Sequence, residues 1–242
     1  MKILRPRIQP AFMLVELLVV TATVGILAAL LLPAISQSKK RAQQIQCVGN
    51  LHQLGIGLQV ILSNDHGYPL YVENRFNAWF SQLEIEGLGI SKPPSKFVEA
   101  GVWRCPSAQW PATFPAKYLR FSYGYNNFGG LSVGTYTNAL GLLGHYSISS
   151  NTLAVLAPIA ESEVIAPSDM MAIGESDGLI FMRSERYDFP KMLLRHQNKA
   201  NVVFCDGHVE SPTLPFLFTD TSDVALSRWN RDYQPHRERL AP

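Results

Sequence analysis

A single carboxylate inside an apolar segment is the feature of this chain whose chemistry is most constrained. Residues 12–32 form a run of 21 residues in which Glu16 is the only charged side chain. About 20 apolar residues are enough for a helix to cross the bilayer core. A charged side chain at the bilayer centre costs about 2.5–3.5 kcal/mol on insertion scales. Glu16 therefore predicts either a cationic partner or a position at the membrane interface.

Imidazole and carboxylate groups near the C-terminus have the chemistry to hold a transition metal. His196 precedes Asp206 by ten positions, and His208 follows the Asp206-Gly207 pair. The alternative, which we favour, is structural: Asp206 serves a turn, and His196 caps or hydrogen-bonds the end of a sheet. We therefore predict no metal site, and the weak candidate ligands are Asp177, Asp206, His196 and His208.

Acidic residues in a loop-rich stretch raise the question of calcium. Ca²⁺ takes six to eight oxygen ligands, including the carboxylates of Asp and Glu. The sequence has no EF-hand spacing, and solvated loop acids are the simpler explanation. No cofactor is predicted, and Ca²⁺ remains the weak alternative, with the acids Glu175, Asp177, Glu185 and Asp188.

Three cysteines, Cys47, Cys105 and Cys205, allow one disulfide in an oxidising compartment. An odd number leaves one thiol free. We prefer the pair Cys47 and Cys105, because Cys205 lies in a sequence typical of a strand. The other pairings stay open at this stage.

Several classes of function are disfavoured. The chain lacks a G-x-S-x-G elbow, an H-E-x-x-H helix and a glycine-rich phosphate loop. Gly55 and Gly57 lie within a helical pattern and lack the third glycine of dinucleotide binding. The net charge is +2, and removal of residues 1–11 leaves 18 basic and 19 acidic residues. We predict no enzymatic activity and no nucleic-acid partner, which would require a basic face.

The elements that position these residues begin with one long helix. Residues 12–33 are apolar on all sides, and the helical pattern continues beyond Pro33 until turn residues at 63–69 end it. At 1.5 Å per residue, this helix is about 78 Å long. We expect residues 34–63 to form an amphipathic continuation that packs on a sheet. Its apolar stripe contains Ile35, Ala42, Ile45, Val48, Leu51, Leu54, Leu58 and Ile61.

Residues 64–242 predict a globular head. Alternation predicts strands at 121–126 and 170–175. Runs at 201–205 and 208–210 flank Asp206-Gly207, which predicts a hairpin with a type I′ turn. The fold class is therefore α+β, with an antiparallel sheet packed on the long helix. We also expect a helix at 78–83, loops at 86–101 and 127–150, and a short extended segment at 102–106.

The stretch from Ala11 to Glu16, Ala-Phe-Met-Leu-Val-Glu, resembles the prepilin signal of type IV pilins and type II secretion pseudopilins. The resemblance implies that a prepilin peptidase cuts between Ala11 and Phe12 and methylates the new amine; the family usually has glycine where this chain has Ala11. A secretory signal peptide has a shorter apolar region, about 7–15 residues. An uncleaved anchor remains the alternative, but it gives Glu16 no role. The basic leader contains Lys2, Arg5 and Arg7.

The C-terminal part resembles a second motif, a His-x9-Asp-Gly module that accompanies prepilin leaders in planctomycetes, verrucomicrobia and related bacteria. His196 and Asp206-Gly207 match it, and so do segments around Cys47 and Cys105. The module has no established activity, and we expect these residues to be structural. About residues 127–165 match no motif.

Together the resemblances imply a pilin-like fold with four parts: a leader at 1–11, a membrane-spanning or filament-core helix at 12–33, its continuation at 34–63, and the head from 64. They imply a subunit of a type II secretion or type IV pilus-like filament, in which Phe12 of one copy pairs with Glu16 of another. The implied partners are the prepilin peptidase, other pilin-like subunits, an inner-membrane assembly platform and lipid. The implied location is the bacterial inner membrane, single-pass, with a cytoplasmic N-terminus and an extracytoplasmic head. The alternative is an anchored module that binds glycan or another envelope polymer through its aromatic residues, namely Trp79, Trp103, Trp110, Tyr123 and Tyr125.

Overall fold

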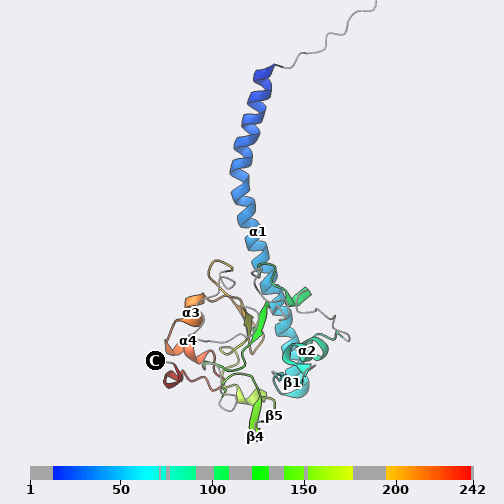
Figure 1. Cartoon of the computed structure of the whole chain (residues 1–242), viewed down its shortest axis with the longest axis vertical. Helices are drawn as coiled ribbons and strands as arrows, with labels where there is room; N and C mark the ends of the chain where they lie inside the picture. Colours follow the sequence, from blue (N-terminus) through cyan, green and yellow to red (C-terminus); the bar gives the residue numbers. More distant parts are fainter. Residues whose placement is uncertain are drawn as a thin grey trace, which may run out of the picture. The chain divides into compact units, whose positions relative to one another are not determined.

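A computed structural model describes residues 13–70, 72–74, 77–90, 101–108, 122–130, 139–149, 152–176 and 195–240. The chain divides into two compact units, Met1–Ala42 and Gln43–Pro242. Helix α1, Leu14–Asp65, has residues in both units (Figure 1). Each unit is described by itself below.

From Leu14 onward, the first unit is helical and belongs to α1. Every residue from Leu14 to Ala42 is exposed, so this segment has no core of its own. Pro33 lies inside the helix, where a proline removes one backbone hydrogen bond. Helical structure continues on both sides of Pro33, as the sequence predicts.

In the second unit, α1 buries one face. The buried positions recur at helical spacing from Cys47 to Leu62. The predicted stripe was therefore right in its second half and wrong in its first, because Ile35 and Ile45 are 59% and 71% exposed. The helix ends at Asp65, and His66 follows in the left-handed region with φ 52°. The buried apolar positions of α1 are Cys47, Leu51, Leu54, Leu58, Ile61 and Leu62.

The main sheet is antiparallel and has the strand order β3-β6-β7-β8. Its strands are β3, Tyr123–Tyr125; β6, Met171–Glu175; β7, Val202–Phe204; and β8, Val209–Glu210. A register shift between Met171 and Ile173 marks a bulge in β6. Bulges of this kind re-aim side chains. Here Met171 and Ile173 belong to hydrophobic clusters on opposite faces of the sheet.

Both faces of the sheet are covered. Val203 packs with Leu54 and Leu58 of α1 in one hydrophobic cluster. Val202 and Phe204 pack on the other face with Leu214, Leu217 and Trp229 from the C-terminal helical region. Figure 1 shows α1 on one side of the sheet, and α3 (Leu214–Phe218) and α4 (Asp223–Ser227) on the other. The chain thus has the predicted α+β fold of pilin type, a long apolar N-terminal helix with an antiparallel sheet.

Smaller elements complete the second unit. Two-stranded pairs form between β1 and β2 and between β4 and β5. Side-chain caps from Thr213 and Ser222 begin α3 and α4. The bounds are β1, Val72–Asn74; β2, Asn77–Ala78; α2, Trp79–Gln82; a π-helix, Leu83–Gly87; 3-10 turns, Gly101–Trp103, Glu161–Glu163 and Arg237–Arg239; β4, His145–Ser149; β5, Thr152–Ala157; α3, Leu214–Phe218; and α4, Asp223–Ser227.

The expected surface loop at 127–150 was wrong over its described residues. Leu142 N–H donates to Asn126 O at 2.7 Å, and Leu143 N–H donates to Asn127 O at 3.0 Å. A Cβ on Gly141 would collide with these backbone atoms. The glycine therefore permits close packing, and the segment continues into β4. Residues 131–138 lie outside the described part.

The expected extended segment at 102–106 was also wrong. Gly101 has φ 57° and starts a 3-10 turn through Trp103. A second turn follows, in which Ala108 N–H donates to Cys105 O at 2.9 Å. Local turn geometry, set by the left-handed glycine and by Pro106, outweighs the strand propensity of Val102 and Trp103.

Candidate functional site

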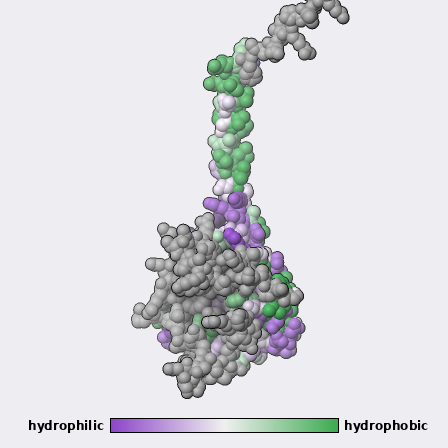
Figure 2. Space-filling view, turned by 45° about the vertical axis from the view of Figure 1, so that its right-hand side comes forward, coloured by the Kyte–Doolittle hydropathy of each residue, from purple (hydrophilic) through white to green (hydrophobic). Residues whose placement is uncertain are grey.

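The N-terminal part of α1 exposes a mainly apolar surface (Figure 2). Among the described helices, α1 is the one long and apolar enough to cross a membrane. The hydroxyls of Thr21 and Thr23 donate to carbonyls of their own helix at 2.9–3.0 Å. These bonds satisfy the hydroxyls without water, as lipid or a helix interface requires. The large apolar side chains exposed by 52–80% are Met13, Leu14, Val15, Leu17, Leu18, Val19, Val20, Val24, Ile26, Leu27, Leu30, Leu31, Leu32 and Ile35.

Glu16 is exposed in the first turn of this helix. Its Oε2 accepts a hydrogen bond from the backbone N–H of Met13 at 3.1 Å. This bond satisfies one N–H of a helix start that has no intrahelical acceptor, and it places the carboxylate near the end of the apolar segment. The expected processing residues, Ala11 and Phe12, lie outside the described residues.

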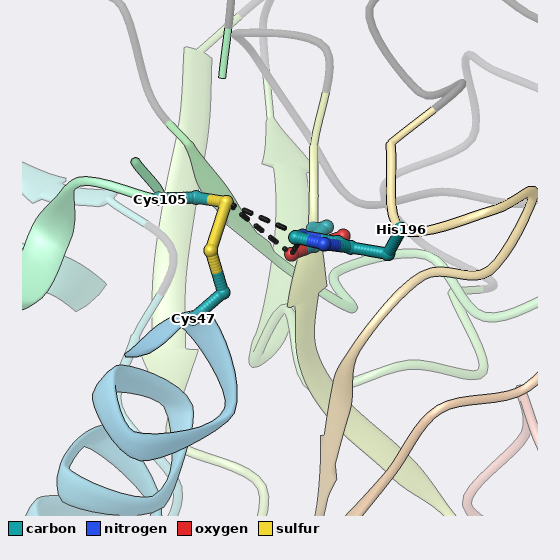
Figure 3. Close-up of side chains that lie close together, drawn as sticks. Cys47, Cys105 and His196 are labelled. Atoms are coloured by element: carbon teal, nitrogen blue, oxygen red, sulfur yellow. Dashed lines mark hydrogen bonds and ion pairs between the residues drawn. A yellow bond between two sulfur atoms is a disulfide. The ribbon is translucent and has the colours of Figure 1, made fainter. Parts of the chain in front are cut away.

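A second group of reactive side chains lies inside the head. Cys47 and Cys105, the preferred pair, are joined in a disulfide with a Cα–Cα distance of 5.0 Å. His196 Nε2 lies 3.4 Å from Cys105 Sγ and 2.8 Å from Glu175 Oε1. Figure 3 shows the His196 ring directed at the Cys105 sulfur. We call Cys47, Cys105, Glu175 and His196 the buried cluster. All four are buried, and the side chains of Glu175 and His196 are each 1% exposed.

Four separate elements supply the buried cluster. Cys47 comes from the buried face of α1, and Cys105 from the turn after the 3-10 helix. Glu175 is the last residue of β6. His196 lies in a turn with φ 50°, followed by two more left-handed residues, Gln197 and Asn198. This unusual backbone directs the imidazole inward, and it positions the first residue of the His-x9-Asp-Gly motif.

Polar neighbours hold Glu175 in place. Asn201 Nδ2 donates to Glu175 Oε1 at 3.0 Å, and Ser211 Oγ donates to Asn201 Oδ1 at 2.6 Å. The buried Arg195 side chain donates to Ser176 O at 2.9 Å. Burial raises the pKa of Tyr123, and the negative charge of Glu175 raises it further. The buried cluster is therefore a fixed, polar site within an apolar core.

The hairpin formed by β7 and β8 packs against α1. Its loop is Cys205-Asp206-Gly207, and of these residues only Gly207 has a positive φ, 91°. The expected type I′ turn was therefore wrong, because that turn needs two positive φ angles. Gln59 Nε2 donates to Cys205 O at 2.7 Å. The loop is thus fastened to α1.

Among the described residues, the weak metal candidates do not form one site, because His196 lies apart from Asp206 and His208. Asp206 Oδ1 pairs with His208 Nδ1 at 2.6 Å, at side chains that are each 38% exposed. His196 instead joins the buried cluster, which is the one close group of three or more possible metal ligands among the described residues. Asp177, Glu185 and Asp188 lie outside the described residues. Within the described part, the calcium alternative therefore retains one acid, Glu175, whereas Ca²⁺ takes six to eight oxygen ligands.

The sequence did not predict that His196 and Glu175 lie beside the Cys47–Cys105 disulfide. The signal available was the position of His196 in the His-x9-Asp-Gly motif, together with Cys47 on an apolar helix face. The aromatic residues named for glycan binding are largely internal. Trp79, Trp103, Tyr123 and Tyr125 are exposed by 1–4%, and Trp110 lies outside the described residues.

Comparison with known proteins adds no further constraint. No family model, no curated protein and no solved structure matches this chain.

Proposed function

We propose that this chain is a pilin-like structural subunit of a type II secretion or type IV pilus-like filament. The observation that carries the proposal is the exposed apolar part of α1, with Glu16 as its only charge. Burying one Val, Leu or Ile side chain away from water is favourable by about 1.5–3 kcal/mol of free energy. A segment with many such side chains must be covered, first by lipid and then by helices of neighbouring subunits.

Glu16 gives this covering its specificity. In apolar surroundings a carboxylate needs a cation, and the amine of Phe12 in a neighbouring copy supplies one after cleavage. The hydrogen bond from Met13 N–H uses one oxygen of Glu16 and leaves the other for the neighbour. The role proposed is assembly and contact, not catalysis.

Membrane insertion precedes assembly in this proposal. A prepilin peptidase removes residues 1–11, an inner-membrane platform adds the subunit, and the head lies outside the cytoplasm. The orientation rests on the prepilin resemblance, because Lys2, Arg5 and Arg7 before the segment are balanced by Lys39, Lys40 and Arg41 after it. The glycan-binding alternative is disfavoured, because four of its five named aromatic rings are buried and ring stacking needs an open face.

Two measurements test the proposal. First, the N-terminus of the membrane-fraction protein is determined with and without co-expressed prepilin peptidase. We expect a methylated Phe12 with the peptidase and Met1 without it. An intact Met1 under both conditions would contradict the processing step and leave a simple anchor.

The second measurement is incorporation into sheared filaments, with Glu16→Ala and Glu16→Gln as the test variants. We expect normal cleavage and about tenfold or more lower incorporation for both, because each removes the charge that pairs. Thr21→Ala is the matched control, since the Thr21 hydroxyl donates to carbonyls of its own helix. Normal incorporation of Glu16→Ala would refute the pairing.

A further inference from the structure

We propose that the buried cluster is a zinc site when its two cysteines are reduced. In that state Cys47, Cys105, His196 and Glu175 bind one Zn²⁺, and the metal takes the place of the disulfide as the link between α1 and the turn at Cys105. This inference concerns the head alone and does not depend on the proposed filament role.

The donor set and its spacing carry the inference. Structural zinc sites use Cys sulfur, His nitrogen and carboxylate oxygen in a tetrahedron, at distances of about 2.0–2.3 Å. Those lengths place neighbouring donors about 3.3–3.8 Å apart. Cys105 Sγ lies 3.4 Å from His196 Nε2 and 3.6 Å from Glu175 Oε1, and all four donors lie within 4.8 Å of one another. In the reduced state, the two sulfurs must part to about 3.8 Å. His196 Nε2 and Glu175 Oε1, which lie 2.8 Å apart, must part to about 3.3 Å.

The surroundings also suit a metal. Ligands of structural metals are oriented by second-shell hydrogen bonds, and Asn201 and Ser211 provide such a chain to Glu175. Two thiolates and one carboxylate exceed the charge of Zn²⁺ by one. A buried cation lies nearby in the fold, because Arg195 precedes His196 in the chain and donates to the backbone oxygen of Ser176, the residue after Glu175. The site is closed, because both cysteines belong to the hydrophobic core.

The chemical steps balance with a dithiol as reductant. The dithiol gives two electrons and two protons to the Cys47–Cys105 disulfide; its own sulfurs become a disulfide, and the S–S bond of the protein becomes two thiols. Zn²⁺ then binds both sulfurs, and the two thiol protons leave to solvent. Because the disulfide is buried, these steps belong to a chain that folds after reduction, so metal binding and folding are coupled.

The test uses the full chain in detergent micelles. The protein is reduced in denaturant with dithiothreitol, freed of reductant under anaerobic conditions, and refolded with one equivalent of Co²⁺ or Zn²⁺. We expect one metal per chain, intense cobalt–thiolate absorption, and native circular dichroism that needs the metal. Refolding without metal uptake would overturn the proposal, and so would failure to refold with metal present.

Variants identify the ligands. Cys47→Ser, Cys105→Ser, His196→Gln and Glu175→Gln should each lower cobalt affinity by about 100-fold or more. Cys205→Ala and His208→Gln are matched controls, a buried thiol and an imidazole outside the cluster, and should bind normally. Equal losses in His208→Gln and His196→Gln would overturn the assignment.

X-ray absorption on the zinc-loaded wild-type chain removes any dependence on how the variants fold. We expect two sulfur neighbours at about 2.3 Å and two nitrogen or oxygen neighbours at about 2.0–2.1 Å. A shell with no sulfur, or with three sulfurs including Cys205, would overturn the proposal.

Discussion

Replacing Gly55 by alanine tests how closely α1 lies against the β7–β8 hairpin. A Cβ built on Gly55 would lie 2.7 Å from Val203 Cγ2 and 2.8 Å from the backbone oxygen of Gly207. A side chain can rotate away, but the Gly207 carbonyl belongs to a loop that Gln59 holds at 2.7 Å. The added methyl group therefore has to push the hairpin and the helix apart.

Two opposing contributions determine how Gly55→Ala changes the free energy of unfolding. Overpacking of this kind costs about 1–3 kcal/mol, and alanine in place of glycine within a helix gains about 1 kcal/mol. Gly49 isolates the second term, because it lies in the same helix and a Cβ there meets nothing within 4 Å. Gly49→Ala should therefore raise the free energy of unfolding. The difference between the two variants should be about 1–3 kcal/mol.

The assay is thermal unfolding of the full chain in detergent micelles, followed by tryptophan fluorescence. Trp79, Trp103 and Trp229 are buried in the head and report its opening. For a unit of this size, 1 kcal/mol shifts the midpoint by about 2–4 °C, so Gly49→Ala should melt about 2–12 °C above Gly55→Ala. Equal midpoints would refute the close contact between α1 and the hairpin.

Two further predictions concern titratable groups in the head. Burial raises the pKa of Cys205 to about 12, so at pH 8 about one thiol in ten thousand is ionised and reactive. Without reductant, iodoacetamide should therefore modify no cysteine in the folded chain and one cysteine after unfolding. Mass spectrometry counts the modified cysteines. Burial alone would raise the pKa of Glu163, but hydrogen bonds from His145 and the Ala160 N–H lower it on balance below 4.5. The pair of Glu163 and His145 therefore stabilises the fold above pH 4.5. This stabilisation is lost as the pH falls through the lower pKa that Glu163 has in the folded state. The difference in free energy of unfolding between wild type and Glu163→Gln should be largest near neutral pH and should shrink in acid; a difference that does not change with pH would contradict it.

The elements that the sequence could predict are those with a local physical signature. The apolar run and the periodicity up to Ile61 depend on neighbours three and four residues away, so the long helix was evident. The hairpin around Asp206-Gly207 was evident for the same reason. Its turn type was not, because the contact of the loop with Gln59 of α1 involves residues far apart in the chain.

The buried cluster depends on contacts that no local pattern encodes. Glu175 looked like the end of a strand next to an acidic turn. Its meeting with His196 requires the pairing of β6 with β7 and three successive left-handed residues. Ile45 is the opposite case, in which a local pattern predicted burial that the fold does not provide. It fits the helical stripe, yet the packed face of α1 starts two residues later, at Cys47.

The Cys47–Cys105 disulfide has a mechanical consequence for a subunit held by its N-terminal helix. Tension applied between the two ends of the chain follows the covalent path, which crosses from Cys47 to Cys105 through the sulfur atoms. The 57 residues between them carry no load, although they include the docked half of α1 and all of β1, β2 and α2. Pulling can therefore unfold the main sheet and the C-terminal helices. The residues between Cys47 and Cys105 bear no tension until the sulfur–sulfur bond is broken.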